Sequence, residues 1–202
     1  MSRPRSTGCS ATRLRVVEGT LTQPVLRAAR LDEAEAIDVL MKLATRDIFP
    51  RVYTAEQTAS AIRFVAAVDR RLISDGTYFV VESGGELIAC GGWSRRAKLY
   101  TGSGEAEGDD RLLDPATEPA RIRAMFVRAD WTRRGLGRAI LTACTDAARA
   151  EGFTKLALMS TLPGVPLYKA FGFTEVEAAQ LPMPDGTVLA GVAMERPIEE
   201  TA

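Results

Sequence analysis

The 202-residue sequence contains no histidine. This absence removes the commonest general base, the Ser–His and Cys–His nucleophile pairs, and most catalytic zinc sites. An enzyme built from this chain has to move protons and stabilise charge with carboxylates, tyrosine, lysine or backbone groups.

Cysteine is scarce, and long apolar runs are missing. Cys9, Cys90 and Cys144 are widely spaced and form no CxxC pair, so we expect neither a disulfide framework nor a bound metal. No apolar run approaches about 18 residues, so we expect no membrane span and no membrane partner. The first 17 residues hold four arginines without a following apolar stretch, so a flexible tail over 1–22 and a cytoplasmic protein are expected.

The composition is that of an ordinary globular protein, with 46% hydrophobic and 26% charged residues and a formal net charge of zero. We expect one domain over residues 23–198. The charge is unevenly placed: residues 121–138 hold six arginines and one acid, whereas residues 105–118 hold six acids and one arginine. Local basicity in a neutral chain favours a local anionic ligand and argues against nucleic acid as a partner.

The hydrophobic pattern predicts an α/β domain with a mixed sheet, in the order β-α-α-β-β-β-α-β-α-β-β. Asp32 is expected to cap the first helix, with Glu35 as its capping-box partner, and Thr54 to open the second. The acidic, glycine-rich residues 97–118 read as a long loop. The predicted helices cover 31–49, 54–72, 138–152 and 165–173, and the predicted strands cover 25–30, 77–81, 87–93, 120–127, 155–161, 174–182 and 187–195.

Residues 133–138, RRGLGR, lie between a predicted strand and a predicted helix. The unpaired N–H groups and the dipole of a helix N-terminus attract anions, glycine allows close approach, and arginine adds charged donors. The segment therefore fits a pyrophosphate, although a simple tight turn explains the two glycines equally well. The third glycine of a dinucleotide fingerprint and the Gly-Lys-Ser/Thr of a Walker loop are both missing.

The neighbouring segments resemble the GNAT superfamily of N-acetyltransferases. The family's loop pattern is Gln/Arg-x-x-Gly-x-Gly/Ala, and residues 132–137 match it except that Thr132 occupies the first position. A second signature, tyrosine followed by x-x-x-Gly-Phe, matches residues 168–173. The resemblance covers 25–195 in element order and is most specific over 120–173. It implies a mixed sheet of about seven strands flanked by about four helices.

The resemblance also implies acetyl-CoA as co-substrate. In the family, the strand before the loop carries a bulge and splays from its neighbour, and the pantetheine arm pairs with that strand. Thr161 stands where the family often has asparagine, and Tyr168 corresponds to the general acid that protonates the departing thiolate. The implied cofactor-binding residues are Met125, Phe126, Val127, Arg133, Arg134, Gly135, Leu136, Gly137, Arg138, Thr161 and Tyr168.

The implied reaction is direct attack of a primary amine on the thioester in a ternary complex. The acceptor, a small molecule or a peptide, cannot be identified from the sequence. The general base is also open: Glu82, Glu86, Glu118 or a water chain. The resemblance implies that the first two helices, the loop at 97–118 and the closing hairpin shape the acceptor side. The closing hairpin is also a possible homodimer contact. The alternative function is a non-catalytic acyl-CoA-binding sensor or partner-binding module.

Overall fold

The structure, a computed structural model, describes residues 23–98 and 110–199. The expected flexible tail (1–22) and the central part of the expected loop (99–109) lie outside the described residues. No described helix has the length and apolarity needed to cross a membrane.

A single seven-stranded sheet forms the centre of the fold, with the strand order β1-β2-β3-β4-β5-β7-β6. Its neighbouring strands are antiparallel except for β4 and β5, which run parallel. The mixed sheet predicted from the sequence is therefore confirmed. The strands are β1 (Val25–Ala28), β2 (Tyr78–Ser83), β3 (Glu86–Ser94), β4 (Ala120–Val127), β5 (Lys155–Thr161), β6 (Thr174–Pro182) and β7 (Val188–Pro197).

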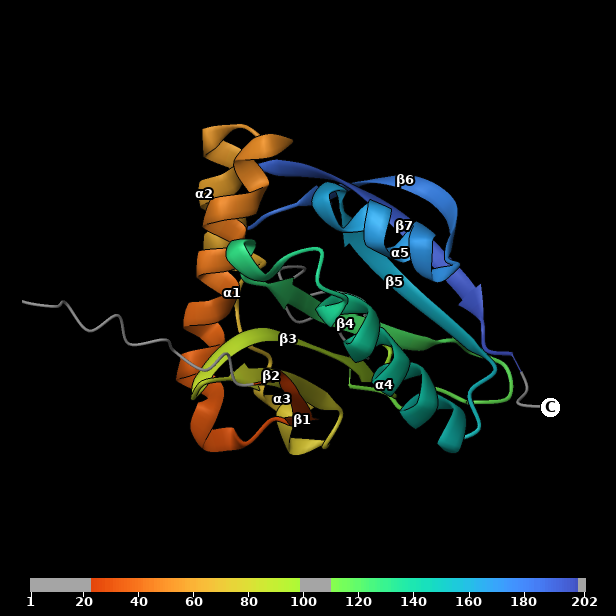
Figure 1. Cartoon of the computed structure of the whole chain (residues 1–202). Helices are drawn as coiled ribbons and strands as arrows, with labels where there is room; N and C mark the ends of the chain where they lie inside the picture. The colour runs from red at the N-terminus through yellow and green to blue at the C-terminus, as the bar shows by residue number, and fades with distance from the viewer. Residues whose placement is uncertain (1–22, 99–109, 200–202) are drawn as a thin grey trace, which may run out of the picture.

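Helices cover both faces of this sheet. In Figure 1, α4 and α5 lie in front of it, and α1 and α2 run along its left-hand side. Successive residues of β2 divide between the two faces, as strand geometry requires: Val80 packs in the core beside α1 and Val81 in the core beside α4. The α-helices are α1 (Ala34–Ile48), α2 (Ala55–Phe64), α3 (Arg70–Ser74), α4 (Leu136–Ala150) and α5 (Val165–Phe171).

Two details of the predicted helices are wrong. The first helix is preceded by a 3₁₀ turn, η1 (Leu31–Glu33), and Glu33 rather than Asp32 organises its start. The Glu33 carboxylate accepts a hydrogen bond from the Arg30 N–H at 2.8 Å and also pairs with Arg27. Glu33 therefore bonds to the main chain at the start of the helix and, through Arg27, also ties that start to β1.

The predicted helix 54–72 is split into α2 and α3. Its start is confirmed, because Thr54 and Gln57 form a reciprocal capping box with two bonds of 3.1 Å. It stops at Phe64 because Asp69 begins a new helix: its carboxylate accepts a hydrogen bond from the Arg71 N–H and pairs with Arg123 of β4. Five α-helices in the described chain therefore replace the expected four.

Candidate functional site

Strand β4 is distorted near its carboxyl end. Opposite β3, the register advances two residues from Cys90 to Gly92 but three from Phe126 back to Arg123, so β4 carries one extra residue. Ala124 takes a positive φ of 50° at this bulge. Gly91 of β3 faces the bulge. A glycine fits there because an added Cβ would collide with the Met125 side chain.

β4 also separates from β5 after a short contact. The two strands pair only at Ala120–Leu156 and Arg121–Ala157. Beyond this point they diverge, as Figure 1 shows between the lower and upper parts of the sheet. Phe126 and Val127 are paired with β3, Met125 lies at the bulge, and none of the three is paired with β5. One edge of this backbone segment therefore borders the opening. The bulge and splay expected from the family resemblance are present.

The N-terminus of α4 faces the same opening. Gly135, its N-cap, has a φ of 83°, and an added Cβ would meet no atom within 4 Å. Arg133 also has a positive φ, at 63°, and Thr132 donates a hydrogen bond from its hydroxyl to the Ala129 carbonyl at 2.9 Å. The first N–H groups of a 15-residue helix are thus presented to open space, which suits an anion.

The second glycine of the motif has a packing role that the sequence does not reveal. An added Cβ at Gly137 would lie 2.8 Å from Cδ2 of Leu167, on α5. This contact brings α4 and α5 close together beside the opening. The two glycines therefore differ: Gly135 provides a backbone conformation, and Gly137 provides room for a neighbouring side chain.

The arginines of the motif also differ. Arg133 lines the opening and has no hydrogen-bond or ion-pair partner in the described part of the chain. Arg138 lines it too but donates to the Ala170 carbonyl at 3.0 Å. Arg134, expected at the same site, instead stacks on Trp131 with its guanidinium 4.5 Å from the ring centre and is not among the lining residues.

Tyr168 is the middle residue of α5, the short helix that follows β5. It is buried, and its ring packs edge-on against Phe173 at 5.7 Å. Burial raises the pKa of its hydroxyl above the ordinary value of 10.0, so the group stays protonated at neutral pH. Thr161, at the end of β5, lines the same cavity.

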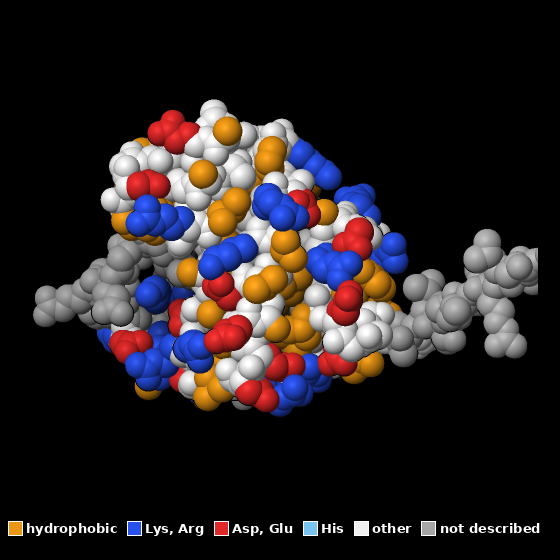
Figure 2. Space-filling model, turned by 90° about the vertical axis from the view of Figure 1, so that its left-hand side faces the viewer, with side chains coloured by type: hydrophobic (Ala, Val, Ile, Leu, Met, Phe, Trp, Pro, Cys, Tyr) orange, Lys and Arg blue, Asp and Glu red, His pale blue; other side chains and the backbone are white. Residues whose placement is uncertain are grey.

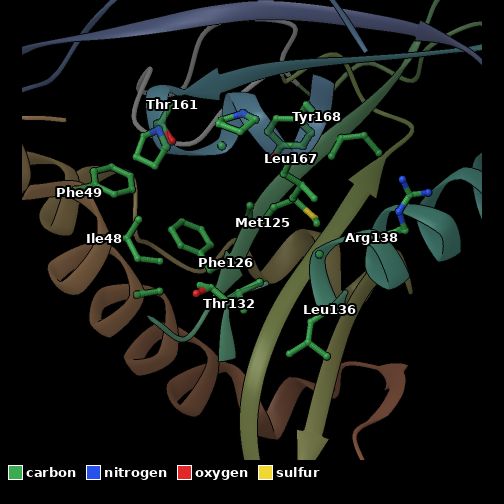
Figure 3. A pocket seen from close by; sticks show the side chains of 18 of the residues that line it. Ile48, Phe49, Met125, Phe126, Thr132, Leu136, Arg138, Thr161, Leu167 and Tyr168 are labelled. Carbon is green, nitrogen blue, oxygen red and sulfur yellow. The ribbon is translucent and has the colours of Figure 1, made fainter. Parts of the chain in front are cut away.

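These elements enclose a cavity of about 610 Å³ (Figure 3). Its α4 end consists of Arg133, Gly135, Leu136, Gly137 and Arg138. Its α1 end consists of Ala44, Ile48, Phe49, Arg51, Val65, Met159 and Leu181. In Figure 3, Leu136 and Arg138 lie at one side and Ile48 and Phe49 at the other, with Phe126 and Met125 of β4 between them.

The sequence pointed to the first two helices and the closing hairpin as surfaces for acceptor choice, but it did not single out the residues of the α1 end. These residues come from α1, the 3₁₀ turn η2 (Phe49–Arg51), the position after α2, β5 and β6. Ile48, Phe49, Val65, Met159 and Leu181 pack in a common core cluster. In the sequence, the only signal of these five residues is an apolar position near the end of an amphipathic helix or strand. That signal is the same for an ordinary core residue.

The three carboxylates considered as general bases lie elsewhere. Glu82 is paired with Arg27, Glu86 with Arg128 and Glu118 with Arg111, each at 2.7 Å. None of the three lines the cavity. The hydrogen bond from Arg111 lowers the pKa of Glu118 to about 2, which makes it a very weak base. The structure therefore does not support any of the three as the general base, because an arginine partner holds each of them outside the cavity.

The described cysteines are not placed for catalysis. Cys90 and Cys144 are fully buried in the sheet and α4, and neither lines the cavity. Burial raises the pKa of the Cys90 thiol to about 12 and also raises that of Cys144. Over residues 23–98 and 110–199, no group of three or more metal-ligating side chains is gathered in one place.

Several solved structures share this fold. A GCN5-related N-acetyltransferase from Rhodopseudomonas palustris aligns with a TM-score of 0.66 and 16% identity, over 89% of this chain and 99% of that chain. PaiA N-acetyltransferase from Thermoplasma acidophilum, solved with coenzyme A, has a TM-score of 0.62 and 12% identity, over 87% and 99%. YncA from Salmonella typhimurium, solved with acetyl-CoA, has a TM-score of 0.58 and 17% identity, over 90% and 97%.

Comparison with curated protein sequences gives no match. At these identities the solved structures establish the fold alone. The sequence itself matches the family model for the acetyltransferase (GNAT) family over residues 40–173, which is more than half of the chain and spans both signatures. With the bulged β4, the splay from β5 and the glycine loop before α4, this match shows that the chain belongs to the acetyltransferase (GNAT) family.

Proposed function

We propose that the protein binds acetyl-CoA in this cavity and transfers the acetyl group to a primary amine. The observation that carries the proposal is the free edge of residues 125–127, beside the splay between β4 and β5. A pantetheine arm carries amides that can pair with such an edge as an added strand does. At the α4 end, the helix N-terminus and the unpaired Arg133 suit the pyrophosphate.

Direct attack of the amine is favoured over an acetylated enzyme. A covalent route needs an activated nucleophile, and the described cysteines are buried with raised pKa values while histidine is absent from the sequence. In the direct route, the amine nitrogen bonds to the thioester carbon and the C–S bond breaks. Tyr168, protonated and lining the cavity, gives its proton to the departing thiolate. The amine releases its proton to water.

The test is acetyl transfer itself. Purified protein is incubated with acetyl-CoA and a panel of amines, and we expect equal amounts of free CoA thiol and of acetylated amine by mass spectrometry. Protein incubated with acetyl-CoA alone should gain no 42-dalton adduct, which distinguishes direct attack from an acetyl-enzyme. Tight acetyl-CoA binding with no product from any amine would instead support the alternative, a non-catalytic acyl-CoA sensor.

A further inference from the structure

The α1 end of the cavity is apolar apart from one cation. Ile48, Phe49 and Leu181 line it and also pack in a common core cluster. Phe49 and Leu181 are almost fully buried, so this wall is fixed rather than adaptable. Arg51, two residues after Phe49, is exposed at the surface and also lines the cavity. A ligand seated here meets hydrocarbon on one side and a positive charge on the other.

The charged side chains that line the cavity, among the residues that the structure describes, are all arginines. Among its described lining residues there is no aspartate, glutamate or lysine, but there are four arginines. Arg123 pairs with Asp69 at 3.0 Å, and Arg138 donates to a main-chain carbonyl. Arg133 and Arg51 line the cavity and have no hydrogen-bond or ion-pair partner in the described chain. Arg133 precedes the N-terminus of α4, whereas Arg51 follows Phe49 after α1.

Arg133 belongs to the pyrophosphate end of the proposed cofactor, so Arg51 remains for the second substrate. A guanidinium binds carboxylates through charge-assisted, often bidentate, hydrogen bonds. Polycationic acceptors such as polyamines would place their charges against arginines with no lining acid to offset them. Cations and anions are interspersed on the face over α1 and α2 (Figure 2), so this face offers no stripe of one charge to attract a strongly charged peptide.

We infer that the acceptor is an apolar α-amino acid, with its side chain at the α1 end and its carboxylate paired with Arg51. This inference rests on the proposed function. It also accounts for the missing general base. Transfer into an apolar site and a nearby guanidinium both disfavour the ammonium form, so they lower the amine pKa. The attacking amine then loses its proton to water without a carboxylate in the cavity.

The first experiment compares acceptors that differ in one group. L-Phenylalanine and phenethylamine share the ring and the amine, but only L-phenylalanine carries a carboxylate. We expect kcat/KM for L-phenylalanine to exceed that for phenethylamine by about tenfold or more, the scale of a charge-assisted pair. Spermidine and a lysine-containing peptide should be poorer than both. A preference for either of these over L-phenylalanine would overturn the inference while leaving acetyl transfer intact.

The second experiment removes the cation. Arg51→Gln should raise the KM for L-phenylalanine about tenfold, with little change in kcat, and leave phenethylamine nearly unaffected. Arg63→Gln is the matched control, because Arg63 is an exposed arginine of α2 outside the cavity lining. Equal effects of Arg51→Gln on both acceptors would contradict a carboxylate contact, since a structural role would not distinguish them.

A binding measurement separates this inference from the proposed reaction. Calorimetry with CoA-saturated protein should detect L-phenylalanine binding that Arg51→Gln weakens and Arg63→Gln does not. This holds even if turnover is too slow to follow. Absence of L-phenylalanine binding to the CoA complex would refute the amino-acid site, whereas binding without turnover would refute only the transfer chemistry.

Discussion

The two ends of the cavity are built from different parts of the chain and from different chemical groups. The α4 end consists largely of main chain in special conformations, including Gly135 at φ 83° and Arg133 at φ 63°, at the start of one helix. The α1 end consists of side chains from α1, the turn Phe49–Arg51, the position after α2, β5 and β6, and these meet only in the folded protein. A site made of main chain suits a ligand group that stays the same, such as a pyrophosphate. A site made of side chains can be altered by substitution to suit a different acceptor. Substitutions at the two ends should therefore separate cofactor binding from acceptor choice.

The largest effect should come from Tyr168, which is proposed to act in the transfer step itself rather than in binding either substrate. Tyr168→Phe removes only the hydroxyl, so packing on Phe173 should persist and the acetyl-CoA dissociation constant should stay nearly constant. General acid catalysis is worth ~10²–10⁴ in rate, and we expect kcat to fall about 10²-fold because a thiolate also leaves unaided. Steady-state kinetics at saturating substrates, with calorimetry on acetyl-CoA, checks this. An unchanged kcat under conditions where chemistry is rate-limiting would reduce Tyr168 to a packing residue.

The pH profile should reveal the acceptor amine rather than an enzyme base. The described cavity lining contains no carboxylate, and histidine is absent from the sequence, so kcat/KM should rise about tenfold per pH unit below the amine pKa. A general acid works while protonated, so its contribution is lost as pH rises through its pKa. Burial puts the pKa of Tyr168 above 10.0, so no falling limb is expected below pH 10. A bell-shaped profile centred near pH 7 would indicate a different acid.

Gly137 allows the packing and phosphate roles of the motif to be separated. Gly137→Ala brings a Cβ to 2.8 Å from Leu167 Cδ2, and we expect acetyl-CoA affinity to fall about tenfold as the Leu167 side chain shifts at the cavity wall. Leu167→Ala in the same protein removes the colliding atoms and should restore most of that affinity. If the double variant binds as weakly as Gly137→Ala, the glycine acts by close approach to phosphate instead. Leu167→Ala alone is the control.

Arg133 and Arg134 are adjacent residues of the same charge in different surroundings. Arg133 lines the cavity without a partner, whereas Arg134 stacks on Trp131 outside it. We expect Arg133→Gln to weaken acetyl-CoA about fivefold and Arg134→Gln less than twofold, since exposed charge contacts are modest. Titration by calorimetry at low and high salt checks this, because only the Arg133 contribution should fade with salt. Equal losses would mean that bulk charge, rather than position, attracts the cofactor.

The contrast between the two ends also explains how far the sequence could lead. Gly135 and Tyr168 each belong to a short sequence motif, and the strand before the loop adjoins the first of these motifs, so all three could be predicted. The order and type of the strands follow from alternating apolar residues, and they are confirmed. The break between α2 and α3 depends on Asp69 pairing with Arg123 of β4, 54 residues away, and no local pattern contains that contact.

The three carboxylates considered as general bases could not be placed correctly for the same reason. Glu82 and Glu86 are held by arginines that lie far away in the sequence, and Glu118 by Arg111 of the same connection, seven residues before it. The sequence alone shows none of these pairings. The packing role of Gly137 likewise depends on Leu167, which only the fold brings beside it. Motifs that set the main-chain conformation lie within one segment, so they can be recognised in the sequence. Side-chain pairs and the α1 end form only when the chain folds, so they cannot.

The smallest predicted effect tests whether Gly135 matters for its conformation. Gly135→Ala forces an L-residue to a φ of 83°, where an added Cβ meets no atom, so strain alone should cost about 1 kcal/mol of unfolding free energy. Gly186 has a φ of 85° and the same open space in the β6–β7 turn, away from the cavity, and Gly186→Ala should cost about the same. Denaturant unfolding should then give similar losses for both variants, while only Gly135→Ala weakens acetyl-CoA binding. Gly135→Asn should recover part of both properties, because asparagine tolerates the left-handed region. If Gly186→Ala lowers acetyl-CoA affinity equally, the loss at Gly135 reflects general destabilisation, and the α4 end does not depend on that backbone conformation.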